Sequence, residues 1–231
     1  MGFNLRCLAP FLRFLVMKKA EKPPRAQSPK PKAPSAPSPE SRAHPLVDIA
    51  IKVGGGLLAH AAYFEGVLAA ISDAADERRL LIVPGGGPFA DTVREVDRQF
   101  ALSDDAAHWM AVLAMDQHAH LITSRLARGA LVRDPSETAA ILNAGGLPVL
   151  APFQWLRDVD PLPHTWDVTS DSIAAWVAGV VGARRLILIK PPGVSARDSV
   201  DEYFDQALPA HVVPVIVAAD RTDELRAALR I

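Results

Sequence analysis

Residues 47–56 read VDIAIKVGGG, a short apolar run that ends in three glycines. Residues 80–87 repeat the pattern with LLIVPGGG. A short apolar run bounded by turn residues predicts a buried strand, and glycines directly after it predict a tight turn at its carboxyl end. We therefore expect two buried strands that each lead into a glycine loop.

The rest of the chain after residue 46 alternates between the two kinds of periodicity. Further strands are predicted at residues 147–151, 185–189 and 212–217. Helices are predicted at residues 60–75, 88–99, 104–127, 136–143, 170–181 and 220–230. Alternating strands and helices predict a mostly parallel sheet with helices on both faces. The expected fold class is α/β, a three-layer α-β-α sandwich formed by one domain at residues 46–231.

The composition limits what the chain can be. It has 231 residues and a formal net charge of -1 at pH 7, so we expect no basic surface for nucleic acid. Cys7 is the only cysteine, which excludes a disulfide within the chain and fits a reducing compartment. No apolar run reaches the roughly 20 residues of a membrane helix. These features predict a cytoplasmic protein that neither binds nucleic acid nor enters a membrane.

The first 45 residues differ in composition from the rest. Residues 18–45 are rich in Pro, Ser, Ala and Lys and lack apolar bulk, so they cannot bury enough surface to offset the entropy of ordering. We expect residues 1–45 to form a disordered tail. One interpretation is that Met17 is the true start and residues 1–16 are not translated. The alternative is that residues 2–16 form a short anchor on a membrane surface.

The glycine loops are candidates for binding phosphate. The two loops consist of Gly54, Gly55 and Gly56 and of Gly85, Gly86 and Gly87. Open α/β sheets bind ligands at the carboxyl ends of their strands, and glycine lets backbone N–H groups approach an anion there. The alternative is that both loops are ordinary tight turns.

Phosphate motifs of other folds fit less well. Neither loop has the Gly-Lys-Ser/Thr ending of a P-loop. Residues 85–90 read GGGPFA and match the dinucleotide pattern G-x-G-x-x-A, but Pro88 lies inside the match and the preceding strand is not the first of the domain. A nucleotide-dependent oxidoreductase therefore remains the weaker alternative.

Lysine is rare in the predicted domain. From residue 44 onward only Lys52 and Lys190 occur, whereas arginine is frequent. Both lysines lie at the carboxyl end of a predicted strand. A lysine ammonium is a compact charge suited to the oxygens of a transferring phosphoryl group. We interpret the two lysines as phosphate-binding residues, the alternative being chance placement.

A third candidate segment reads WDVTSDSIA at residues 166–174. Asp167, Thr169, Ser170 and Asp171 place carboxylates and hydroxyls at the start of a predicted helix. Helix capping and the helix dipole explain one or two of these residues. The density of polar groups favours a functional site.

A predicted helix carries Asp116, His118 and His120. Asp116 and His120 share one helix face, as metal ligands do, whereas His118 points elsewhere. We favour a solvated or partly buried helix face over a metal site, so no metal centre is expected. The tryptophans are interpreted as core or oligomer-interface residues; they are Trp109, Trp155, Trp166 and Trp176.

The order of these motifs resembles the amino-acid-kinase superfamily. The motifs are strand-Lys-x-Gly-Gly-Gly, strand-Pro-Gly-Gly-Gly and Asp-Val-Thr-Ser-Asp-Ser-Ile-Ala, and the resemblance covers residues 46–231. It implies that Lys52 bridges the transferring phosphate and that Asp171 orients the lysines. Lys190 is the implied second phosphate lysine, since no lysine follows it.

The resemblance also implies binding roles. The first glycine loop, Thr169 and Ser170 would bind nucleotide phosphates, while the second loop, Asp91 and Asp167 would bind the acceptor. The implied cofactors are ATP and Mg²⁺, and the implied partners are a small-molecule substrate and further copies of the chain in a homo-oligomer.

One branch of the superfamily matches best. DVTSDSIA and the stretch AHWMAVLAMDQ at residues 107–117 resemble the archaeal and methylotroph kinases of methanofuran biosynthesis. This resemblance implies an aminomethyl-furan-methyl phosphate as the acceptor. UMP, isopentenyl phosphate and an amino-acid carboxylate remain alternative acceptors. A catalytically silent nucleotide- or oxyanion-binding protein on the same fold also remains open.

Overall fold

The computed structural model describes residues 45–194 and 199–230. Six strands form one parallel sheet in the order β3-β4-β2-β1-β5-β6. The strands are β1 (Ile49–Val53), β2 (Leu80–Pro84), β3 (Gly129–Val132), β4 (Leu147–Leu150), β5 (Arg185–Lys190) and β6 (Val213–Ala218). The predicted α/β fold with a parallel sheet is confirmed. The predicted tail, apart from Pro45, lies outside the described residues.

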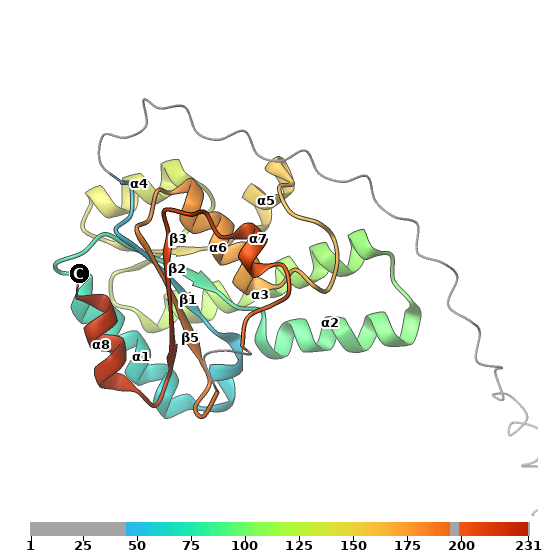
Figure 1. Ribbon diagram of the computed structural model, residues 1–231, viewed down its shortest axis with the longest axis horizontal. Coiled ribbons are helices and arrows are strands. Elements are labelled where there is room, and N and C mark those ends of the chain that lie inside the picture. The colour runs from blue at the N-terminus through green and yellow to red at the C-terminus, as the bar shows by residue number, and fades with distance from the viewer. Residues whose placement is uncertain (1–44, 195–198, 231) are drawn as a thin grey trace, which may run out of the picture.

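Helices cover both faces of the sheet (Figure 1). One core cluster joins the sheet to α1 (Ala61–Ala74) and α8 (Thr222–Leu229). The other joins it to α6 (Ser170–Val180), and to the shorter helices α4 (Pro135–Asn143), α5 (Phe153–Val159) and α7 (Phe204–Ala207). The chain therefore forms the expected three layers. None of the helices in the described ranges is both long and apolar enough to cross a membrane.

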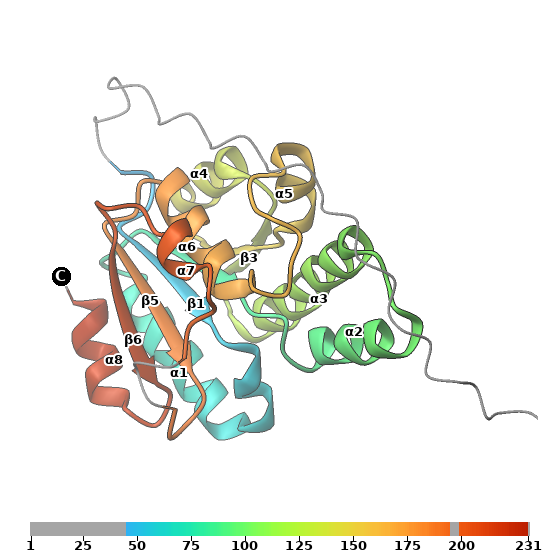
Figure 2. The same ribbon diagram turned by 45° about the vertical axis from the view of Figure 1, so that its right-hand side comes forward.

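Two further helices extend beyond the sheet. α2 (Gly87–Phe100) and α3 (Asp104–Arg125) lie side by side (Figure 2), and α3 also contacts α1. Ser103 caps α3 as expected, accepting a hydrogen bond from the N–H of Ala106 at 3.2 Å. α3 contributes Ile122 to one core cluster and Met115 to the other. It therefore packs against both halves of the core.

The burial of the central strands explains their apolar sequences. Every residue of β1 and of β2 is buried, because helices lie above and below them. Side chains alternate along a strand, so Ile49, Ile51 and Val53 face α1 while Ala50 faces α6. Lys52 continues the second set and therefore points to the α6 side.

Four short elements were not predicted. These are β3, α5, α7 and the 3₁₀ helix η2 (Gly55–Ala59). β3 reads GALV, which gives only three apolar side chains after a glycine, and only Val132 is fully buried. Pairing with β4 rather than its own pattern makes it a strand. The others are too short for a helical period to appear in the sequence.

β6 forms one edge of the sheet and is more exposed than the other strands; Val213 keeps 57% of its surface. The N–H groups of Val213 and Ala219 donate inward to the carbonyls of Arg184 and Lys190, at 3.0 and 2.9 Å. Because successive N–H groups of a strand point in opposite directions, Pro214 occupies a position that faces outward.

The two glycine loops pack backbone against backbone. A Cβ atom on Gly55 would lie 2.2 Å from the backbone nitrogen of Gly87, which no side chain can tolerate. Gly87 also has a φ of 54°, in the left-handed region that favours glycine. The loops therefore need glycine for their close approach as well as for their turns.

We predict that Gly55→Ala destabilises the protein by at least about 1–3 kcal/mol, because backbone atoms must move to accept the new methyl group. Gly66 provides a matched control. It is exposed in α1, and a Cβ there would meet nothing within 4 Å. Gly66→Ala should raise stability by roughly 0.5–1 kcal/mol through helix propensity. Urea unfolding of both variants measures the difference, and equal stability would contradict the close packing of the loops.

Candidate functional site

Three buried charges meet at the carboxyl edge of the sheet. The Nζ atom of Lys52 lies 2.8 Å from Oδ1 of Asp171 as an ion pair. The Nζ atom of Lys190 donates a hydrogen bond to Oδ2 of the same carboxylate at 2.7 Å. The three residues are 6%, 4% and 6% exposed in the order Lys52, Asp171, Lys190. The structure thus brings together the three residues that the sequence assigned to catalysis.

The elements explain this convergence. β1 and β5 pair in parallel with Lys52 opposite Leu188, so Lys190 lies two residues further along the neighbouring strand. Both lysines occupy positions whose side chains face α6. Asp171 belongs to the first turn of α6, where the helix dipole favours a negative charge. Two strand ends and one helix start therefore meet at a single carboxylate.

The ionisation of the cluster follows from burial and charge. Burial alone would raise the pKa of Asp171, but Lys52 and Lys190 more than offset it, so the pKa lies below its ordinary value. Burial, followed by repulsion from Lys52, lowers the pKa of Lys190, although Asp171 opposes this. Asp171 is therefore ionised at neutral pH, with both of its oxygens beside ammonium groups.

Asp201 fixes the start of α6. Its Oδ2 accepts hydrogen bonds from the N–H and the hydroxyl of Thr169 at 2.9 and 2.6 Å and from the N–H of Ser172 at 3.0 Å. Its Oδ1 accepts from the hydroxyl of Ser172. Lys190 also donates to the carbonyl of Ser199, just before Asp201. Two residues of the segment after β5, Ser199 and Asp201, therefore bind Lys190 and the start of α6, which carries Asp171.

A cleft of about 320 Å³ opens beside Lys52. Both glycine loops contribute to its lining through Gly55, Gly56, Gly86 and Gly87. Its apolar lining residues include Val112, Met115, Val168 and Ile173. Its charged lining residues are Lys52, Asp91, Arg94 and Asp104. The ammonium group of Lys52 and the first N–H groups of α2 suit an oxyanion here, while the apolar wall suits the carbon part of a small molecule.

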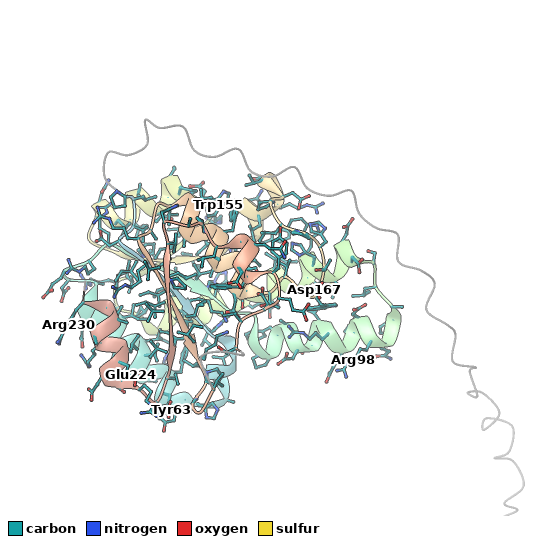
Figure 3. The ribbon with its side chains drawn as sticks, in the orientation of Figure 1. Tyr63, Arg98, Trp155, Asp167, Glu224 and Arg230 are labelled. Carbon is teal, nitrogen blue, oxygen red and sulfur yellow. The ribbon has the colours of Figure 1, made fainter. Side chains whose placement is uncertain are left out.

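The other predicted site residues lie at different distances from this cleft. Thr169 and Ser170 line it, although the donors of Thr169 are engaged by Asp201. Asp91 lines it and pairs with Arg94 at 2.8 Å. Asp167 is exposed, contacts Thr165 and is not among the lining residues. Figure 3 labels Asp167 on the side of the molecule where α2 lies, with Arg98 further out along α2.

Trp166 closes one side of the cleft. Its Nε1 donates to Oδ2 of Asp97 at 2.9 Å, and the guanidinium of Arg94 lies 4.8 Å from its ring centroid. The sequence assigned this tryptophan to the core or to an oligomer interface; the structure places it half-buried at the cleft rather than in the core. A tryptophan anchored through its N–H presents a rigid apolar surface to a ligand.

A pair of stacked histidines borders the cleft. His108 lines the cleft, and the centroid of its ring lies 4.1 Å from the ring centroid of His164. His164 places Nδ1 2.7 Å from Asp105 and Nε2 2.8 Å from Asp160. Burial and then repulsion from His164 lower the pKa of His108 to about 4. His108 therefore meets a ligand as a neutral imidazole at pH 7.

His118 points away from the face shared by Asp116 and His120, as expected, and it is completely buried. Its Nδ1 lies 2.7 Å from the carbonyl oxygen of Gly85. Asp116 is partly buried and accepts from the N–H of Phe153 at 3.0 Å, whereas His120 is exposed. His118 is buried because α3 contributes to both core clusters and so exposes less surface than a helix that covers one face of the sheet.

The site does not fit a metal ion held by the protein. Within the described ranges no group of three or more His, Cys, Asp or Glu residues could hold one. Both oxygens of Asp171 are paired with lysines, and both oxygens of Asp201 accept hydrogen bonds from α6. The two carboxylates beside the lysines are thus already satisfied, and we assign no step to an ion bound by them.

Sequence reasoning missed several of these residues. Asp201 is 30 residues from Asp171 along the chain, and no local pattern connects them. His108 lay within the stretch that carried the family resemblance but had no role assigned to it. Arg94 is three residues after Asp91, a spacing typical of an ion pair on a helix surface, so the sequence did not indicate that Arg94 lines the cleft.

Comparison with known proteins gives a family and a fold. The model of the amino acid kinase family matches residues 49–199. The (5-(aminomethyl)furan-3-yl)methyl phosphate kinase of Methanocaldococcus jannaschii is 27% identical over 143 residues, which are 60% of this chain and 63% of that protein. The chain thus matches less than two thirds of the length of this relative.

Two solved structures resemble the fold. The UMP kinase of Bacillus anthracis has a TM-score of 0.56 and 13% identity, over 77% of this chain and 89% of that one. The UMP kinase of Ureaplasma parvum has a TM-score of 0.52 and 13% identity, over 76% of this chain and 91% of that one. At this identity the likeness shows the fold alone.

We predict that Asp171→Asn lowers the free energy of unfolding by about 3–5 kcal/mol at pH 7, because two buried ammonium groups lose their counter-charge. The exposed Asp167→Asn is the matched control and should change stability by less than about 0.5 kcal/mol. Denaturant unfolding at pH 7 measures both.

The pH dependence gives a second check. The folded pKa of Asp171 lies below its ordinary value of 3.8, so its stabilisation is complete above pH 3.8 and is lost as pH falls through the folded pKa. The stability gap between the native protein and Asp171→Asn should therefore be constant near neutrality and narrow in acid. An Asp171→Asn protein as stable as the native one at pH 7 would rule out this role for the carboxylate.

Proposed function

The chain belongs to the amino acid kinase family, and from this premise we propose that it transfers the γ-phosphoryl group of ATP to a small acceptor. The observation that carries the proposal is the bridge from Lys52 through Asp171 to Lys190, placed beside two glycine loops and a cleft. Phosphoryl transfer depends on positioning and on neutralising the oxygens of the moving group. Two ammonium groups held by one carboxylate supply that neutralisation without a change of protonation.

Asp171 organises the lysines in this proposal. Both of its oxygens face ammonium groups, and its pKa is lowered, so it is a poor acceptor for a substrate proton at neutral pH. Transfer through a loose transition state needs little help with proton removal. An acceptor that is itself a phosphate is already ionised, so no general base is required.

The donor nucleotide would carry Mg²⁺ on its own phosphates. Mg²⁺ commonly keeps several waters and binds through substrate phosphates. The ion would supply charge neutralisation of the β- and γ-oxygens. The residues of this chain would bind the phosphates through Lys52, Lys190 and the N–H groups of Gly55 and Gly56, since the N–H of Gly54 donates to the carbonyl of Ile189.

For the acceptor we propose an aminomethyl-furan-methyl phosphate. The relative from M. jannaschii is a kinase of that compound by name. The cleft offers groups for each part of it: Lys52 and Arg94 for a phosphate, carboxylates of Asp91 and Asp104 for an ammonium, and Trp166 with its apolar neighbours for a ring. A small-molecule acceptor suits the size of the cleft. That the chain works in the cytoplasm as a homo-oligomer remains a prediction.

An acceptor screen tests the proposal. The protein is incubated with ATP, Mg²⁺ and one acceptor at a time, and ADP is measured. We expect ADP formation with the furan-methyl phosphate to exceed that with UMP, isopentenyl phosphate or glutamate by at least about tenfold in kcat/KM. A preference for another acceptor would support the kinase activity but contradict the proposed acceptor. ATP binding by calorimetry without ADP from any acceptor would support a silent binding protein instead.

We predict that Lys52→Arg lowers turnover about a hundredfold or more while the protein stays folded. Arginine keeps the charge but spreads it over a larger planar group. The position is enclosed, since Lys52 is buried and its Nζ already lies 2.8 Å from Oδ1 of Asp171. Arg125→Lys makes the reverse exchange in an exposed ion pair with Glu65 and should keep full turnover. Near-normal turnover of Lys52→Arg would remove Lys52 from the mechanism.

A further inference from the structure

His118 lies within α3 and is completely buried, yet it belongs to neither the ion cluster nor the cleft lining. Its Nδ1 lies 2.7 Å from the carbonyl oxygen of Gly85. A carbonyl oxygen can only accept, so Nδ1 carries the proton and donates it. The ring of Phe64 packs against the imidazole ring, with 6.0 Å between the ring centroids.

The second ring nitrogen has no such contact. Nε2 is buried and meets no hydrogen-bonding partner among the described residues. Burial, together with the cation of Lys52, lowers the pKa of His118, so the ring is neutral and Nε2 keeps a lone pair. A leucine or phenylalanine would fill this space without an unsatisfied polar atom. Packing alone therefore does not account for a histidine here, whereas the hydrogen bond to Gly85 does.

Gly85 is held from two directions. Its N–H donates to the carbonyl of Val53 at 2.8 Å, and its own carbonyl accepts from His118. A Cβ on Gly85 would lie 3.3 Å both from Cε of Lys52 and from Oγ of Ser170. Gly85 therefore faces the ion cluster with its Cα while its carbonyl is turned toward α3.

The next N–H group is oriented by the same contact. The carbonyl of Gly85 and the N–H of Gly86 belong to one trans peptide and point in opposite directions. Since His118 draws the carbonyl into the core, the N–H of Gly86 points away from the core. Gly86 lines the cleft and directly precedes the first residue of α2, where N–H groups have no partner within the helix.

We propose that His118 is a positioning residue that holds the Gly85–Gly86 peptide so that the N–H of Gly86 donates to an oxyanion in the cleft. The identity of that oxyanion as the acceptor's phosphate rests on the proposed function. The orientation of the peptide does not rest on it, since it follows from the hydrogen bond and from peptide geometry.

Three substitutions separate the hydrogen bond from the packing. In His118→Asn the amide nitrogen takes the place of Nδ1 and can still donate to Gly85. In His118→Gln the amide nitrogen reaches the place of Nε2, so the donor is misplaced while the residue stays polar. His118→Leu removes the donor and keeps an apolar core. Melting temperatures identify which variants fold. If His118→Leu does not fold, the comparison of His118→Asn with His118→Gln still tests the proposal.

The first readout is the amide resonance of Gly86 in protein labelled with ¹⁵N-glycine and titrated with inorganic phosphate. We expect its proton to shift downfield in the native protein and in His118→Asn, with a shift reduced by at least half in His118→Gln. No shift of Gly86 in the native protein would overturn the proposal. An equal shift in His118→Gln would overturn it as well.

The second readout is kinetic and uses the furan-methyl phosphate as acceptor. We expect His118→Asn to keep the native KM and His118→Gln to raise it about tenfold, as for one lost hydrogen bond to a charged group. An equal fall in kcat in both variants with unchanged KM would show a merely structural residue and overturn the proposal. If the native protein turns over no acceptor, the proposed function fails, and the amide titration still decides on His118.

Discussion

Two ammonium groups share one buried carboxylate at the end of the central strands. Lys52 and Lys190 come from neighbouring strands and would repel each other without Asp171 between them. Asp201 also attracts Lys190, whereas Lys52 pairs with Asp171 and lines the cleft. Because a buried charge is costly without a full complement of partners, an anion that enters the cleft beside Lys52 is stabilised. The same contact that joins β1, β5 and α6 therefore also holds a cation at the cleft.

The surrounding structure keeps this contact in place from several sides. Asp201 secures the start of α6, and the close packing of the glycine loops brings β1 and β2 together at their ends. His118 connects the second loop to α3. Each of these supports uses a backbone group of the site as a partner. The positions of the donors are therefore set before any ligand arrives, which lowers the reorganisation that binding requires.

The sequence predicts those features that depend on local pattern. The buried strands were visible because helices on both faces demand continuous apolar runs, as in IAIKV and LLIVP. Lys52 and Lys190 were visible because they are the only lysines from residue 44 onward and lie near the carboxyl ends of such runs. Asp171 was visible because its neighbours formed an unusual group of hydroxyls and carboxylates.

Other features depend on contacts between distant parts of the chain. Nothing near Asp201 indicates that it caps a helix 30 residues earlier. His118 was expected to point away from Asp116 and His120, but the period of α3 does not predict its complete burial, which comes from both core clusters around α3. β3 exists through its pairing with β4. Such features can be identified only from the three-dimensional structure, because a local sequence pattern depends on one segment of the chain.

The edge strand β6 determines how copies of this chain can meet. An exposed edge normally offers a row of unpaired N–H and C=O groups to another strand. Here Pro214 stands at an outward position, so one donor of that row is missing and its ring occupies the space of an incoming strand. Continuous sheets running from one molecule to the next across β6 are therefore disfavoured. At this edge the chain is therefore a poor template for fibre-like aggregation.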